Sequence, residues 1–226
     1  SLNTDFLKIA FLFLLVGYGT KVGLAPMHTW LPDAHSQAPT PVSAILSGFL
    51  LNLGLYCILR YIPILEKADH YSGWSTGILV FFGVVSILVS AAFIIAQKDV
   101  KRLLAYHSVE HLGIITLGFG VGGVGVFAAL FHTLNHSICK TLSFFCAGRL
   151  GQIYGTHEME RLTGVFQRAP IWGLGLFTSI LALIGVAPFC IFMSEWQLLK
   201  AIVDTRSFWA GFFFVFGSCV VFVGAL

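Results

Sequence analysis

The chain has 226 residues, of which 57% are hydrophobic and only 10% are charged. Ordinary soluble domains carry about 25% charged residues, so the composition excludes that class and indicates a polytopic membrane protein. The formal net charge of +3 is small and scattered along the sequence, which argues against a nucleic-acid partner.

Apolar stretches of membrane-spanning length recur along the whole sequence. Crossing a bilayer takes about 20 helical residues, and seven stretches reach or approach that length: residues 5–26, 42–62, 77–96, 103–122, 125–147, 170–192 and 208–226. The pattern predicts an all-α fold. The chain begins with Ser1 and ends inside an apolar run, so we expect one membrane domain, residues 1–226, that is an interior piece of a longer chain.

The first stretch carries a lysine beside residues that weaken a helix. Lys21 is followed closely by Gly23 and Pro26, and glycine and proline both disfavour regular helical hydrogen bonding. We therefore expect a broken helix near 5–26, with Lys21 at a hydrated interruption. The alternative is a lysine at a helix end that extends to the membrane surface.

Weaker polar signals follow in the next two segments. Asp33 and His35 lie in a loop that has no lysine or arginine, where they suit either proton entry or a turn. Asn52 and Tyr56 lie four residues apart and form one polar notch in the apolar stretch 42–62. We treat these four residues, together with Asn135 in the stretch 125–147, as a candidate accessory polar path.

The fourth stretch contains the sequence His107-Ser108-Val109-Glu110-His111. This sequence fits H-x-x-E-H, a zinc motif in which two histidines share one helix face and the glutamate acts as a base. No third ligand stands at a recognisable spacing, and a structural polar cluster explains the residues equally well. The sequence therefore predicts no metal site, and an intramembrane metalloenzyme is kept as an alternative reading.

Three side chains that can hold a proton recur every four residues in the fifth stretch: His132, His136 and Lys140. Each step of four advances about 40° around a helix, so all three lie on one stripe, with Asn135 beside them. A lysine at bilayer depth costs roughly 2.5–3.5 kcal/mol even on the lenient insertion scale. The stripe therefore predicts a proton relay in the helix 125–147, against the alternative of a polar seam that holds helices together.

The sixth stretch repeats the features of the first. Gly185 and Pro188 interrupt it, and Glu195 follows just beyond the interruption. We expect a second broken helix over 170–200. Paired broken helices indicate a transport site in membrane carriers.

Two segments carry a family resemblance. Residues 21–35 and 98–106 resemble the antiporter-like proton-pumping subunits of respiratory complex I, of group 4 membrane-bound [NiFe] hydrogenases and of Mrp-type sodium/proton antiporters. Residues 17–21, 47–52 and 192–196 are most similar to the hydrogenase-4 type. The resemblance implies a fold of roughly fourteen transmembrane helices in two inverted repeats, of which this chain would be the second half with its flanks.

The resemblance also implies roles for individual residues. Lys21 matches the lysine of the family's first broken helix, and Glu195 matches the charged residue of the second. His132, His136 and Lys140 match the central relay helix. Asn52 departs from the pattern, because several complex I subunits have a bridging lysine there and an asparagine cannot titrate.

The function implied is proton translocation by one subunit of a redox-driven membrane complex, with partners that include the lipid bilayer, other membrane-arm subunits and a peripheral redox arm. We expect no cofactor in this chain, since [NiFe], iron–sulfur or flavin centres would lie in partner subunits, and none of the 5 cysteines forms a Cys-x-x-Cys pair. The expected location is a prokaryotic cytoplasmic membrane. The alternatives are a non-conducting structural anchor subunit and a Na⁺/H⁺ antiporter subunit.

Overall fold

The computed structural model describes residues 3–68, 70 and 72–225, and regular structure in these residues is helical, without strands. The predicted all-α class is confirmed. The helices are α1 (Thr4–Val22), α2 (Trp30–Gln37), α3 (Thr40–Ile45), η1 (Leu46–Leu50), α4 (Leu51–Ala68), α5 (Trp74–Ile94), α6 (Val100–Val121), α7 (Val124–Tyr154), η2 (Met159–Arg161), α8 (Val165–Arg168), α9 (Pro170–Leu183), α10 (Cys190–Asp204) and α11 (Phe208–Ala225).

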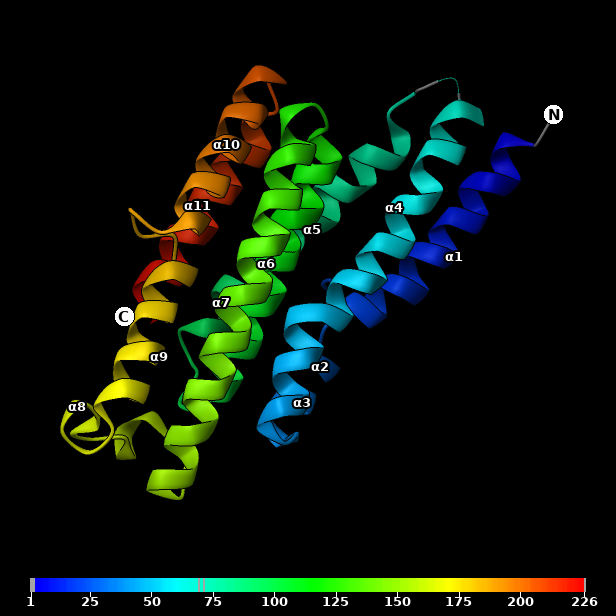
Figure 1. Cartoon of the computed structure of the whole chain (residues 1–226). Coiled ribbons are helices and arrows are strands. Elements are labelled where there is room, and N and C mark those ends of the chain that lie inside the picture. Colours follow the sequence, from blue (N-terminus) through cyan, green and yellow to red (C-terminus); the bar gives the residue numbers. More distant parts are fainter. Residues whose placement is uncertain (1–2, 69, 71, 226) are drawn as a thin grey trace.

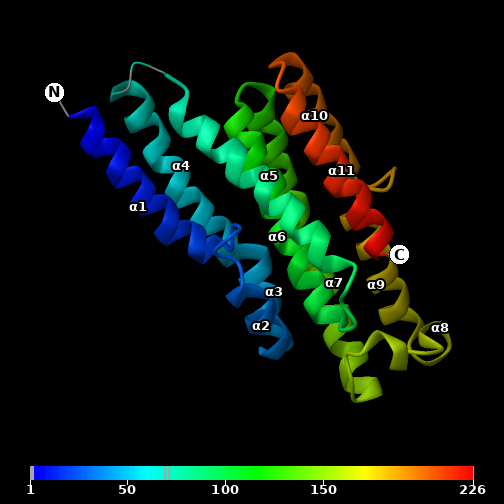
Figure 2. The ribbon, with the colours of Figure 1, turned by 180° about the vertical axis from the view of Figure 1, so that it is seen from behind.

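The helices form one bundle around a central trio. Helices α5, α6 and α7 lie in the middle, α1 and α4 pair on one side, and α9, α10 and α11 cover the other side (Figures 1 and 2). The short helices α2 and α3 pack against α6 and α7. The central position of α6 brings one helix into contact with both flanking groups.

Helix α6 is buried all round. Every residue from 103 to 118 is buried, including the polar ones. A helix without an exposed face belongs to the core of a bundle. Polar side chains in this stretch must therefore find partners within the protein.

Glycines bring α5 and α6 into backbone contact. A Cβ atom at Gly83 would lie 2.7 Å from the backbone nitrogen of Leu117, and one at Gly113 would lie 2.9 Å from the carbonyl oxygen of Gly83. Small residues permit such close helix approach in membranes. The contact fixes the position of α6 in the bundle.

Three helical segments of the described chain are long and apolar enough to cross a membrane: Thr40–Ala68, Trp74–Ile94 and Phe208–Ala225. The first is continuous through α3, η1 and α4, and is longer than the predicted stretch 42–62. Helix α9 is apolar but short. Helices α6 and α7 occupy the predicted stretches 103–122 and 125–147, yet their inward-facing polar residues lower their hydropathy.

The first break in a helix follows α1. Gly23 adopts the left-handed conformation with φ of 81°, which ends the helix and favours glycine. The freed backbone groups are hydrogen-bonded, because the Trp30 Nε1 donates to the Thr20 carbonyl (2.6 Å) and the Ala25 amide donates to Ser86 Oγ (2.9 Å). A break inside a membrane protein is tolerated when such groups are satisfied by protein.

The second break separates α9 from α10. Helix α9 ends at Leu183, Gly185 has φ of 71°, and helical structure resumes at Cys190. The predicted apolar stretch 170–192 therefore contains a break, as expected for the second broken helix. Both breaks contain a cis peptide bond before proline, at Ala25–Pro26 and Ala187–Pro188.

The α5–α6 contact gives a stability prediction. We expect Gly83→Val to destabilise the protein by about 1–3 kcal/mol, since the added side chain must push against the α6 backbone. Gly77→Val on the same helix is the matched control, because a Cβ there meets nothing within 4 Å. The measurement is the thermal unfolding midpoint in detergent, and equal midpoints for the two variants would contradict the proposed packing role.

Candidate functional site

The predicted stripe on α7 points into the bundle. His132, His136 and Lys140 are at most 1% exposed, and all three lie on the side of α7 that packs against α6. The opposite side of the helix exposes large apolar side chains: Leu134, Ile138, Leu142 and Phe145. Helix α7 therefore presents its polar stripe to protein and its apolar side to the exterior, as a lipid-facing helix does.

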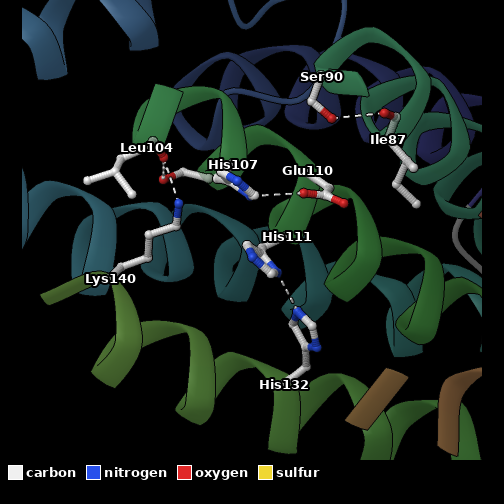
Figure 3. Close-up of polar contacts among 9 residues, drawn as sticks. Ile87, Ser90, Leu104, His107, Glu110, His111, His132 and Lys140 are labelled. Atoms are coloured by element: carbon white, nitrogen blue, oxygen red, sulfur yellow. Dashed lines mark hydrogen bonds and ion pairs between the residues drawn. The ribbon is translucent and has the colours of Figure 1, made fainter. Parts of the chain in front are cut away.

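His132 connects three helices through its ring nitrogens. Its Nε2 lies 2.9 Å from Nδ1 of His111 on α6, and its Nδ1 lies 2.8 Å from Oγ of Ser194 on α10 (Figure 3 shows the first contact). Ser194 is 1% exposed and also contacts the carbonyl of Ile191 at 2.8 Å. These contacts form a continuous buried row of groups that can pass a proton.

Lys140 lies at the other end of the stripe and reaches α6. Its side chain has no exposed surface, and its ammonium donates a hydrogen bond to the Leu104 carbonyl (2.6 Å; Figure 3). Leu104 stands one turn before His107 on the same helix. The charge of Lys140 is therefore held against α6 rather than at the membrane surface.

His136 lies between these two ends. The centroids of the His111 and His136 rings are 5.1 Å apart, and both ring nitrogens of His136 are buried without a hydrogen-bond partner in the described chain. The free Nε2 of His111 is in the same condition. Buried polar atoms are satisfied by protein or by ordered water in nearly all structures, so this part of the bundle is suited to internal water.

The proton relay predicted from the sequence contains no residue of α6, although α6 contributes to the site. His107, Glu110 and His111 are buried beside the α7 stripe, and Nδ1 of His107 lies 3.2 Å from Oε2 of Glu110. The four-residue spacing of the two histidines was a visible signal of a shared face. The sequence did not reveal that this face meets α7.

Three further predicted residues lie at the site. Glu195 on α10 has a carboxylate oxygen within 4.8 Å of ring nitrogens of His111 and His132. Asn135 donates to the Cys190 carbonyl (3.3 Å), at the start of α10. His35 is fully buried and stacks on Phe144 of α7 at a centroid distance of 5.3 Å.

Asn52 contacts α7 at one side of the stripe. Its Nδ2 donates to Oγ of Ser137 (3.0 Å) and to the Gly48 carbonyl (3.1 Å). Gly48 permits this approach, because a Cβ there would lie 2.8 Å from Oγ1 of Thr141. Asn52 therefore forms a hydrogen bond with α7, and its amide side chain cannot carry a charge.

The remaining predicted residues lie apart from the stripe. Lys21 is exposed on α1, in a groove lined by Ala10, Phe13, Leu14, Gly17 and Tyr18. Asp33 is exposed and pairs with Arg102 (3.1 Å), and Tyr56 is 55% exposed beside Arg60. Lys21 lies in the last turn of α1, directly before the break at Gly23, and its side chain is on the outer surface of the described chain.

Two sets of side chains have donor atoms close enough to share one metal ion. His107, Glu110 and His111 form one set, and His111, His132 and Glu195 form the other, with donor atoms within 4.8 Å of one another in each. Imidazole and carboxylate donors suit Zn²⁺. An ion in either set would bind His111 and would lie in the same buried region as the Lys140 ammonium.

Comparison with known proteins supports the class that the geometry suggests. The family model described as NADH:quinone oxidoreductase/Mrp antiporter, TM, matches residues 2–221. The hydrogenase-4 component F homolog of Methylacidiphilum infernorum (isolate V4) is 44% identical over 201 residues, which are 88% of this chain and 42% of that relative.

Two solved structures share the fold. A chain of the archaeal membrane-bound sulfane sulfur reductase matches with a TM-score of 0.91 and 30% identity, over 98% of this chain and 46% of that one. A chain of respiratory complex I from Thermus thermophilus matches with a TM-score of 0.84 and 28% identity, over 95% of this chain and 46% of that one. The chain therefore spans less than half the length of these relatives.

A helical bundle with broken helices and a buried row of protonatable groups defines a polytopic membrane protein of the antiporter-like class. The chain belongs to the NADH:quinone oxidoreductase/Mrp antiporter transmembrane family. The predicted superfamily and its likeness to hydrogenase-4 components are confirmed.

The metal-capable sets give a prediction about composition. We expect His107→Ala to leave the metal content of the purified, assembled complex unchanged, since the nearby Lys140 ammonium disfavours a second cation in the same buried region. Elemental analysis of the parent and variant complexes measures this. Loss of one equivalent of zinc in the variant would favour the metalloenzyme reading.

Proposed function

We propose that the chain translocates protons across the membrane as an antiporter-like subunit of a multi-subunit, redox-driven complex. The observation that carries the proposal is the buried contact series His111–His132–Ser194, which joins α6, α7 and α10. A polar seam that only holds helices together needs paired hydrogen-bonding groups. It gains nothing from a ring nitrogen left unpaired at the end of the series. The free Nε2 of His111 supplies such an acceptor.

The hydrogen bonds give the row a direction. When the Ser194 hydroxyl donates to the Ile191 carbonyl, its oxygen accepts the Nδ1–H of His132. A neutral imidazole has one donor and one acceptor nitrogen, so Nε2 of His132 then accepts the Nδ1–H of His111. The Nε2 of His111 is left with a lone pair that faces the interior and can take up a proton.

A proton bound at that nitrogen can move along the row. Uptake at Nε2 of His111 releases its Nδ1 proton to Nε2 of His132, and His132 then carries the charge. Imidazoles suit such a transfer because their ordinary pKa lies near 6.5. Glu195, adjacent to Ser194 and close to both rings, is the group that we assign as the terminal exchange site.

Lys140 is assigned as the proton-loading group of the stripe. A buried ammonium with one carbonyl partner is sensitive to any charge that moves close to it. A redox change in a partner subunit can thus alter its protonation without direct contact. Lys21, on the outer face of α1, is assigned to the same relay, because the family resemblance matches it to the lysine of the first broken helix.

The parent complex is proposed to be of hydrogenase-4 type in a prokaryotic cytoplasmic membrane, supported by the 44% identity to a hydrogenase-4 component F homolog. Redox centres are assigned to partner subunits. A peripheral redox arm and other membrane-arm subunits are the expected partners, and the solved relatives of this fold are multi-subunit complexes.

Removing the loading group tests the proposal. In the whole complex in sealed membrane vesicles, we expect Lys140→Ala to reduce proton uptake on the order of 100-fold, the loss typical of a positioned proton-transfer group, while the complex stays assembled. A fluorescent amine that reports the pH gradient measures uptake. The control is Lys98→Ala, because Lys98 is 81% exposed in a surface pair with Glu160. Normal uptake by Lys140→Ala would favour the anchor reading.

The identity of the ion is tested separately. With sodium replaced by potassium in both compartments, we expect the redox-driven pH gradient to form at the same initial rate, since the two imidazoles of the row transfer protons and offer sodium no oxygen ligand. The same vesicles with added sodium serve as the reference. A gradient that requires sodium would support a Na⁺/H⁺ antiporter subunit.

A further inference from the structure

Two buried side chains on α6, His107 and Glu110, have no task in the row described above. They lie on consecutive turns, with Nδ1 of His107 and Oε2 of Glu110 3.2 Å apart, and their side chains are 0% and 4% exposed. The other ring nitrogen of His107 has no hydrogen-bond partner in the described chain. An isolated carboxylate in such a place is strongly disfavoured unless it is paired or protonated.

The pair lies next to the buried ammonium. Lys140 binds the Leu104 carbonyl at 2.6 Å, one turn before His107. In the view of Figure 3, the His107 ring lies between the Lys140 ammonium and the Glu110 carboxylate. The ammonium of Lys140 on α7 and the carboxylate of Glu110 on α6 therefore provide the cation and the anion of a charge-balanced set.

The groups that face the pair come from several helices. His111 lies one turn further on α6, His136 and Lys140 face it from α7, and Glu195 stands beyond His111 on α10. His35 on α2 is buried near the Lys140 end of the stripe. On α5, the described neighbours of α6 include Ser86 and Ser90, which do not titrate in water.

We propose that His107 and Glu110 form a second proton-loading site, which holds the proton that Lys140 gives up before it enters the row at His111. The inference rests on the proposed function of proton translocation. In this step Nζ of Lys140 loses a proton and becomes a neutral amine, and the imidazole of His107 gains that proton. The resulting imidazolium is stabilised by the Glu110 carboxylate at Nδ1, and the proton then passes to the free Nε2 of His111.

Charge balance gives the pair its role. While Lys140 is protonated, an ionised Glu110 compensates the ammonium. After transfer, the same carboxylate compensates the imidazolium of His107, so the number of buried charges does not change. Moving a charge between two sites that share one counter-charge avoids the large penalty of an unpaired ion in a low-dielectric interior.

The test uses Glu110→Gln and Glu110→Asp in the whole complex in sealed vesicles. We expect Glu110→Gln to lower redox-driven proton uptake on the order of 100-fold, with assembly and redox turnover retained, and Glu110→Asp to restore part of the loss. Glu160→Gln is the control, because Glu160 is 78% exposed in its pair with Lys98. Normal uptake by Glu110→Gln would overturn the inference.

An infrared measurement distinguishes loading from a structural role. Redox-triggered difference spectra of the parent complex should contain a carboxylate band, which arises because the cation beside Glu110 changes from the Lys140 ammonium to the His107 imidazolium, and this band should shift in Glu110→Asp and persist in Glu160→Gln. A spectrum unchanged by Glu110→Asp would overturn the inference even where Glu110→Gln fails to assemble. Normal uptake by Lys140→Ala would instead contradict the proposed function itself, so the two failures are distinguishable.

Discussion

The burial of the Lys140 ammonium against the Leu104 carbonyl is the constraint around which the polar side chains of the site are arranged. A lysine without exposed surface must find its stabilisation inside the protein, since no water surface is within reach of its ammonium. Helix α6, buried from residue 103 to 118, supplies the carbonyl that accepts this hydrogen bond. Helix α7 turns its polar stripe toward α6 and its apolar residues to the opposite side. The two helices are complementary because α7 carries the Lys140 ammonium and α6 carries the Leu104 carbonyl that accepts its hydrogen bond.

The polar stripe of α7 could be predicted from sequence because it depends on one helix alone. A spacing of four residues places His132, His136 and Lys140 on one side whatever surrounds them. The contacts of His132 with His111 and Ser194 could not be predicted in the same way. They depend on the relative register of three helices, and that register is set by close packing such as the α5–α6 glycine contact.

Other differences between sequence and structure have equally local reasons. The sequence assigns no metal site to the H-x-x-E-H segment and leaves a structural polar cluster open, because the sequence alone does not show that protonatable groups of α7 lie beside it. The second broken helix, by contrast, is predicted from Gly185 and Pro188, although the residues within the break are apolar and hydropathy alone does not register a left-handed Gly185. The sequence predicts that Lys21 lies at a helix break. The side of α1 on which its side chain emerges depends on how α1 packs against α4, which the sequence does not show.

The break before α10 separates two residues of the site from the preceding helix. Ser194 and Glu195 belong to α10, which is not continuous with α9, so their position is set by the packing of α10 against α7. The Ser194–His132 contact spans 2.8 Å, and a displacement of about 1 Å takes such a pair beyond hydrogen-bonding range. The connection between the imidazole of His132 and the proposed exchange site at Glu195 therefore depends on the register between α10 and α7.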